Sequence, residues 1–140
     1  QTKNALLMKG RGNYLCLLKA ENFAPPGDLL DKRENKRMDS LRRWIRRTET
    51  GDRAELTDLP EDSPWWSDLN ATAESCLGQA CAFYSDCYVT RMRRKAQGAD
   101  VLVVNHSLLC ADQRNDDSFG KIIPKTVILP RKLDFCRERE

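Results

Sequence analysis

The sequence lacks the features that mark several common classes of protein. No stretch reaches the roughly 18 consecutive apolar residues of a membrane-spanning helix, and residues 1–10 lack the apolar core of a signal peptide. Histidine occurs once, aromatic residues make up 7% of the chain, and no phosphate-binding loop of the form Gly-x-x-x-x-Gly-Lys-Ser/Thr is present. We therefore expect a soluble, cytoplasmic protein that by itself does not cradle the phosphates of ATP.

The chain is large enough for one modest hydrophobic core. It has 140 residues, of which 40% are apolar and 32% charged, and this length is too short for two nucleotide-motor domains. It contains no internal repeat and no low-complexity tract. One small domain, or a piece of a larger protein, is the expected organisation.

Basic residues are unevenly distributed, although the net charge is only +3. They gather in two clusters, Arg42, Arg43, Arg46 and Arg47, and Arg91, Arg93, Arg94 and Lys95. Two local basic faces on a nearly neutral chain indicate a site for a polyanion. A solvated helix face explains the same residues, and that interpretation stays open.

Apolar spacing predicts two helices. Met38, Leu41, Trp44 and Ile45 have helical spacing and predict a helix over about 36–50, with Gly51 as its stop. A second helix is expected over 88–99, with Val89, Met92 and Ala96 on one face. The acidic, turn-rich stretch 52–75, broken by Pro60 and Pro64, predicts a structured loop, in which Trp65 and Trp66 cover the core more readily than they stack on bases.

Strand signals are short. Val101–Val104 is typical of a strand buried on both faces of a parallel sheet, and Asn105–Leu109 is expected to open a helix after it. Weaker candidates are Ala5–Met8 and the apolar residues between Ile122 and Leu129. Because the chain offers hardly any strand for 101–104 to pair with, we expect part of the fold to lie outside it.

The six cysteines carry the clearest chemical signal. They are Cys16, Cys76, Cys81, Cys87, Cys110 and Cys136. Nothing marks the chain as secreted, so metal binding explains them better than disulfides. Cys76, Cys81 and Cys87 are separated by four and five residues, and Cys16 is available as a fourth ligand. This loose spacing favours an iron-sulfur cluster, with zinc as the alternative.

Two strings contain the candidate ligands: Lys9–Cys16 leads into the first cysteine, and Cys76–Cys87 carries the other three. The first string resembles the beginning of the cluster domain in DinG-like and XPD-like superfamily 2 helicases, and the second resembles the three-cysteine segment of the DinG branch. Thr50–Leu56 is similar to the same branch, and Ala99–Leu109, with its Asn-His pair, resembles the return into the first motor domain. The motifs occur in the family's order and cover roughly residues 5–123.

The resemblance implies a mostly α fold, namely a small helical iron-sulfur domain with long loops and a short strand or strands that belong to the flanking RecA-like motor domain. It assigns 1–100 to the cluster domain, 101–129 to the motor domain and 130–140 to a divergent tail. A mainly structural [4Fe-4S] cluster would be held by Cys16, Cys76, Cys81 and Cys87. The alternatives are a zinc-binding structural module and a redox-active iron-sulfur protein.

The implied parent is an ATP-dependent 5′–3′ DNA helicase, and its partners are single-stranded DNA or a DNA fork and the remainder of the motor. Lys9, Arg11 and the arginines and lysine of both basic clusters become candidates for phosphate contacts. Core packing is expected of the aromatic residues Tyr14, Phe83, Tyr84 and Tyr88. We expect a structural hydrogen-bonding role for His106, burial as a small apolar residue for Cys110 and no assigned role for Cys136.

The family's Asp-Glu-Ala-His box is missing, because Thr126–Leu129 leads into Pro130–Leu133 instead. ATP and Mg²⁺ would therefore act only in the full-length parent, and this chain alone is expected to be inactive. The departure from Pro130 onward suggests a truncated gene, a frameshift or an excised piece.

Overall fold

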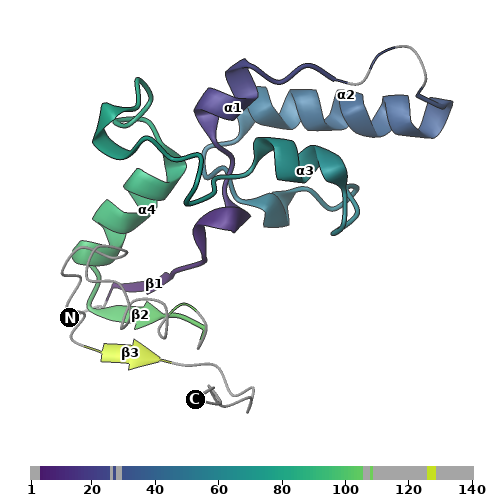
Figure 1. Ribbon diagram of the computed structural model, residues 1–140. Helices are drawn as coiled ribbons and strands as arrows, with labels where there is room; N and C mark the ends of the chain where they lie inside the picture. Colours follow the sequence, from purple (N-terminus) through teal and green to yellow (C-terminus); the bar gives the residue numbers. More distant parts are fainter. Residues whose placement is uncertain (1–3, 26, 28–29, 106–107, 109–125, 129–140) are drawn as a thin grey trace, which may run out of the picture. The chain divides into compact units, whose positions relative to one another are not determined.

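A computed structural model of the chain describes residues 4–25, 27, 30–105, 108 and 126–128 (Figure 1). The chain forms two compact units. One unit is Arg11–Val89, and the other combines Gln1–Gly10 with Thr90–Glu140. The boundary predicted at residue 100 thus falls inside the second unit, and the roles assigned to the predicted domains stay predictions.

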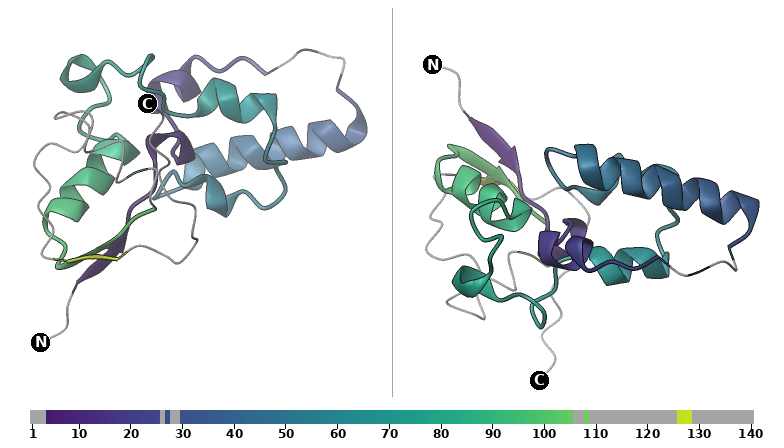
Figure 2. Two further views of the ribbon diagram at one scale, coloured as in Figure 1. Left: turned by 60° about the horizontal axis from the view of Figure 1, so that its bottom comes forward. Right: turned by 90° about the horizontal axis from the view of Figure 1, so that it is seen from above.

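The second unit contains a three-stranded parallel sheet of order β1-β2-β3. Its strands are β1 (Ala5–Leu7), β2 (Val101–Val103) and β3 (Thr126–Ile128), and they lie side by side in Figures 1 and 2. The predicted strand at 101–104 is confirmed, and Leu102 is buried. The expectation that it has hardly any partner is wrong. Parallel partners need no adjacent hairpin, so strands far away in the sequence flank β2 on both edges.

The helix α4 (Tyr88–Gln97) confirms the second predicted helix and ends two residues earlier than predicted. Val89, Met92 and Ala96 are buried, as their spacing predicted. After β2, the Asn105 side chain accepts a hydrogen bond of 2.8 Å from the Leu108 amide, which is the bond of a helix N-cap. His106 and Cys110 lie outside the described residues, so their predicted roles stay predictions.

The unit Arg11–Val89 consists of short helices and connecting loops. Its helical elements are η1 (Arg11–Asn13), α1 (Leu17–Glu21), α2 (Lys32–Arg47), η2 (Arg53–Glu55), α3 (Pro64–Leu69) and η3 (Gly78–Ala80). The longest is α2, which runs beside α3 in both views of Figure 2. The described chain is thus partly helical with a short parallel sheet. None of its described helices is long and apolar enough to cross a membrane.

The prediction of a loop over 52–75 is wrong where α3 and η2 form. Ser63 occupies the N-cap position of α3 and Pro64 follows it. Proline is favoured in the first turn of a helix because the amide it lacks has no intrahelical partner there. The two prolines that suggested a broken segment therefore include one that begins a helix.

The core of this unit lies between its helices. It contains the buried residues Tyr14, Leu15, Met38, Leu41, Leu56, Leu59, Trp66, Leu69, Ala71 and Tyr88. The Trp66 ring meets the Trp44 ring edge to face, with centroids 6.1 Å apart, and the Arg53 guanidinium lies 5.7 Å from the Trp66 ring centroid. Trp66 is therefore a core residue, as predicted, and it ties α2 to α3.

Candidate metal centre and nucleic-acid interface

The four cysteines of the predicted ligand set all lie in the unit Arg11–Val89. Each is a free thiol: Cys76 is exposed, and Cys16, Cys81 and Cys87 are half-buried. Cys16 occupies the N-cap position of α1, and the other three flank η3 and lead into α4. Cys110 and Cys136 fall outside the part of the chain that the structure describes.

Backbone hydrogen bonds fix the position of Cys16. Its amide donates to the Leu69 carbonyl at 2.8 Å, and the Leu15 amide donates to the Gly51 carbonyl at 2.8 Å. The Ala71 amide, close to Leu69 along the chain, donates to the Tyr14 carbonyl at 2.9 Å. The segment before Cys16 is thereby held between two loops that are distant in sequence.

Cys87 is anchored through its neighbour Tyr88. The Tyr88 ring is buried, and its hydroxyl donates a 3.0 Å hydrogen bond to the Thr48 carbonyl at the end of α2. The ring also packs against Gly51, whose φ is +65°. Tyr14 is buried too, so both tyrosines are core residues as expected, whereas Phe83 and Tyr84 are half-buried.

The segment Thr72–Cys87, which carries three of the four cysteines, contains no buried residue. Its turns rest on local backbone bonds, such as Cys81 N–H to Gly78 O at 3.1 Å and Tyr84 N–H to Cys81 O at 3.0 Å. Leu77 is 57% exposed. Apolar burial therefore does little to hold this segment in place.

Across the described ranges, no three or more histidine, cysteine, aspartate or glutamate side chains are grouped so that they could hold one metal ion. The donor chemistry nevertheless fits a cluster, because four thiolates in one unit are the ligand set of a [4Fe-4S] centre. In such a cluster each thiolate binds a different iron. Its ligands therefore need not converge on one point, as four ligands of a zinc ion must.

The Thr50–Leu56 segment, part of the family resemblance, is a hydrogen-bonded junction. The Glu55 carboxylate accepts hydrogen bonds from Trp44 Nε1 at 2.6 Å, from Thr48 Oγ1 at 2.8 Å and from Thr50 Oγ1. Partial burial acts to raise the Glu55 pKa, but these three hydrogen bonds outweigh it, and the pKa lies below its ordinary value. Sequence analysis missed this carboxylate, whose donors come from α2 and the turn after it.

The candidate phosphate contacts differ in exposure. The four predicted arginines in α2, Arg42, Arg43, Arg46 and Arg47, are exposed, and Arg42 lies 3.9 Å from Asp39. Lys9, Arg11 and Arg93 are half-buried, whereas Arg91, Arg94 and Lys95 are exposed. Among these, Lys9, Arg91, Arg93 and Arg94 already interact with other groups of the chain. The two basic clusters belong to different units, and α2 presents the more accessible one.

Sequence analysis also missed two exposed lysines, Lys32 and Lys36, that begin the same face of α2. Their spacing from Arg43 and Arg47 indicates a shared face. The steps from Lys32 to Lys36, to Arg43 and to Arg47 are four, seven and four residues, and such steps return to one side of a helix. Lys32 was missed because the helix was predicted to begin only at about residue 36.

Comparison with known proteins finds ATP-dependent helicases as relatives of the chain, although no protein-family model matches it. It is 44% identical to the ATP-dependent DNA helicase YoaA of Haemophilus influenzae and 40% identical to that of Escherichia coli, each over 129 residues. These matches cover 91% of this chain and 20% of each relative. The ATP-dependent helicase DinG of Mycobacterium tuberculosis is 38% identical over 120 residues, which are 76% of this chain and 18% of the relative.

The chain is thus a homologue of a segment of the YoaA and DinG helicases, which confirms the resemblance to DinG-like helicases, whereas the iron-sulfur domain stays a prediction. It spans about a fifth of the length of the curated relatives it matches.

Proposed function

We propose that this chain is the iron-sulfur module of a cytoplasmic, DinG-like, ATP-dependent 5′–3′ DNA helicase. Cys16, Cys76, Cys81 and Cys87 hold a [4Fe-4S] cluster, and the module contacts single-stranded DNA beside the region where the duplex is separated. ATP, Mg²⁺ and the unwinding reaction belong to the full-length protein. The homology supports the helicase assignment, and the cysteine-bearing segment Thr72–Cys87, in which no residue is buried, carries the cluster assignment.

Ordering the segment Thr72–Cys87 costs conformational free energy. Fixing the backbone costs roughly 1–2 kcal/mol per residue, and folded segments usually offset that cost by burying apolar side chains. No residue from Thr72 to Cys87 is buried. Metal-thiolate bonds supply a different source of stability, because a metal that binds only the folded arrangement adds its binding free energy to folding.

Through Cys16, the proposed cluster would attach the segment Thr72–Cys87 to the core of the unit. The segment that ends at Cys16 is bonded to Gly51 and Leu69, so it belongs to the well-packed part of the unit. A cluster that joins Cys16 to the three other cysteines would make this attachment. We therefore assign the cluster a mainly structural role, with rigidity as its contribution to strand separation.

The DNA contact rests on α2. Arg42, Arg43, Arg46 and Arg47 are exposed on one short stretch, and exposed arginines bind the phosphates of any sequence. Such binding weakens as salt rises, because neutralised phosphates release their counterions.

The test is a metal analysis of the 140-residue chain, purified without oxygen. Iron, sulfide and zinc are measured, and the visible spectrum of the same sample is recorded. We expect about four irons and four sulfides per chain and a broad absorption, because a cubane with four thiolate ligands has that composition. Cys81→Ser should lose the absorption and lower the melting temperature together, because the ligand set also holds the segment in place.

Cys110→Ser is the matched control, since Cys110 is outside the proposed ligand set, and it should keep its iron. Zinc at one per chain with no absorption would replace the cluster with a structural zinc site. A reversible redox potential that DNA does not alter would favour the electron-transfer alternative. A Cys81→Ser variant that keeps both absorption and melting temperature would remove Cys81 from the ligand set.

A further inference from the structure

Helix α2 presents a line of four exposed cations to solvent, which we name the outer stripe: Lys32, Lys36, Arg43 and Arg47. Positions separated by four, seven and four residues lie on one side of an α-helix. At 1.5 Å per residue the line is about 22 Å long. The cationic surface therefore extends along the whole helix, well beyond the four clustered arginines.

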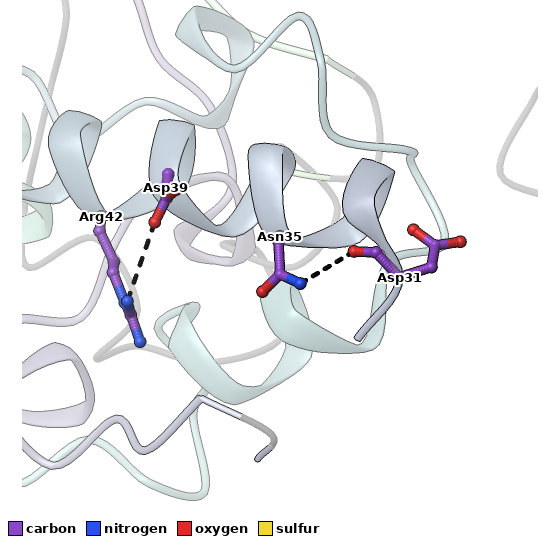
Figure 3. A network of polar contacts seen from close by, with 4 residues as sticks. All are labelled: Asp31, Asn35, Asp39 and Arg42. Atoms are coloured by element: carbon purple, nitrogen blue, oxygen red, sulfur yellow. Dashed lines mark hydrogen bonds and ion pairs between the residues drawn. The ribbon is translucent and has the colours of Figure 1, made fainter. Parts of the chain in front are cut away.

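Few acidic groups of the chain neutralise the cations of the outer stripe. Its four side chains form no hydrogen bond or ion pair with any residue that the structure describes. Asp39 is the one acid on this side of α2, between Lys36 and Arg43, and its carboxylate lies 3.9 Å from Arg42, which is outside the stripe (Figure 3). The cations of the stripe are thus available to an external anion.

The arrangement also weakens the helix that carries it. Lys32 and Lys36 are four residues apart, as are Arg43 and Arg47, and like charges at this spacing repel each other on a helix surface. A polyanion laid along the stripe would relieve both repulsions at once.

The chemistry of this face favours a phosphate polymer over other anionic surfaces. A helix that binds a membrane combines its basic face with exposed apolar residues, and protein interfaces are anchored by aromatic or aliphatic side chains. The buried apolar residues of α2, Met38 and Leu41, face the core instead. The stripe consists of cations alone, with no aromatic ring on which a base could stack.

We propose that the outer stripe of α2 is a track for the phosphodiester backbone of a single DNA strand, which it contacts through phosphates and not through bases. This inference deepens the proposed DNA contact and rests on it. It adds Lys32 and Lys36 to the contact and gives the bound strand a direction parallel to the helix axis. It also requires that an abasic strand bind as well as a normal one.

The test measures the affinity of the whole chain for a labelled 20-nucleotide oligothymidylate by fluorescence anisotropy from 50 to 200 mM salt. Each phosphate contact with a single strand contributes about −0.7 to the slope of log K against log salt. Replacing both Lys32 and Lys36 by alanine should therefore reduce the steepness of that slope by about 1.4. Equivalently, the ratio of wild-type to variant affinity should shrink about sevenfold over this salt range.

The matched control replaces both Arg33 and Arg37, which removes the same charge from the same two turns of α2 but off the stripe. It should retain most of the wild-type slope, and melting curves should show that both variants fold. An equal effect of the two double variants would overturn the stripe and leave only a general charge effect.

Two further outcomes separate this inference from the proposed function. Wild-type binding that is unaffected by loss of Lys32 and Lys36 would overturn the track while leaving the DNA contact intact. No binding by the wild-type chain would overturn the DNA contact itself. Weaker binding of an abasic strand would show that bases are contacted, contrary to the inference.

Discussion

At the scale of single residues, Gly51 shows how one position supports the candidate site. Its backbone has φ +65°, a conformation that L-residues with a Cβ rarely adopt. A Cβ at this position would also overlap the Tyr88 ring. Its carbonyl accepts the Leu15 hydrogen bond next to Cys16, and Tyr88 follows Cys87. Gly51 therefore links the surroundings of two predicted ligands.

Three glycine-to-alanine variants separate the cost of left-handed backbone strain from the cost of overlap with the Tyr88 ring. Gly51→Ala should destabilise the fold most, since about 1–2 kcal/mol of left-handed strain adds to an overlap worth about 1–3 kcal/mol. Gly78→Ala should show the strain alone, because its φ is +57° and nothing lies within 4 Å of the new Cβ. Gly27→Ala, which has neither feature, should change stability little. Urea unfolding gives the free energy of unfolding of each variant. Equal losses of stability for Gly51→Ala and Gly78→Ala would show that the Tyr88 contact is unimportant.

The sequence could predict which residues are buried better than the contacts they make, and the ligand role of the cysteines stays a prediction. Cysteine spacing identified the candidate ligands, and apolar spacing placed Met38 and Leu41 in the core. Gly51, however, was predicted to stop a helix, whereas α2 ends at Arg47 and Gly51 makes room for Tyr88. That partner is distant along the chain, and local patterns contain no information about it.

At the scale of elements, α2 begins where a capping box fixes it. The Asp31 side chain accepts hydrogen bonds from the amides of Arg33 at 2.8 Å and Glu34 at 2.7 Å, and the Glu34 carboxylate accepts the Asp31 amide at 3.0 Å. Asn35 adds a 3.0 Å bond to the Asp31 carbonyl (Figure 3). The bonds to the Asp31 and Glu34 carboxylates satisfy amides that the start of any helix leaves without partners.

Replacing Asp31 by alanine should therefore destabilise the chain by about 1 kcal/mol, within a range of about 0.5–2 kcal/mol for lost N-caps. Asp39→Ala is the matched control, since it makes the same substitution in the same helix where the residue forms only a surface ion pair. Such pairs contribute about 0–1 kcal/mol. Circular dichroism during urea unfolding compares the two, and a larger loss for Asp39→Ala would contradict the capping assignment.

Element boundaries were predicted less well than element types. The helix predicted over about 36–50 is α2, but it runs from Lys32 to Arg47, because the Asp31-x-x-Glu34 signal was overlooked. The Ser63-Pro64 start of α3 was taken for a loop. Parallel pairing of β2 with strands near both ends of the described chain could not be predicted from neighbouring residues, since no hairpin signal accompanies it.

At the scale of the whole molecule, the proposed roles lie in one of the two units. The four candidate ligands and α2 belong to Arg11–Val89, and the parallel sheet belongs to the other unit. A sheet of three three-residue strands is short by the standards of globular proteins. The relatives are about five times as long as the segment matched here. The proposed cluster and the proposed DNA contact thus both belong to the unit Arg11–Val89.

Metal removal should affect the two units differently, and hydrogen exchange measured by mass spectrometry can show it. With iron removed by a chelator under reducing conditions, amides in Thr72–Cys87 should exchange much faster, because no buried side chain holds this segment and its structure would lose the metal-thiolate bonds. Amides of Leu15 and Cys16, bonded to Gly51 and Leu69, should lose less protection.

The strands β1 and β2 serve as the internal control, since the unit that contains them holds none of the proposed ligands. Unchanged exchange in Thr72–Cys87 would mean that the segment is ordered without metal, and a uniform rise in both units would mean that the metal stabilises the chain as one cooperative body.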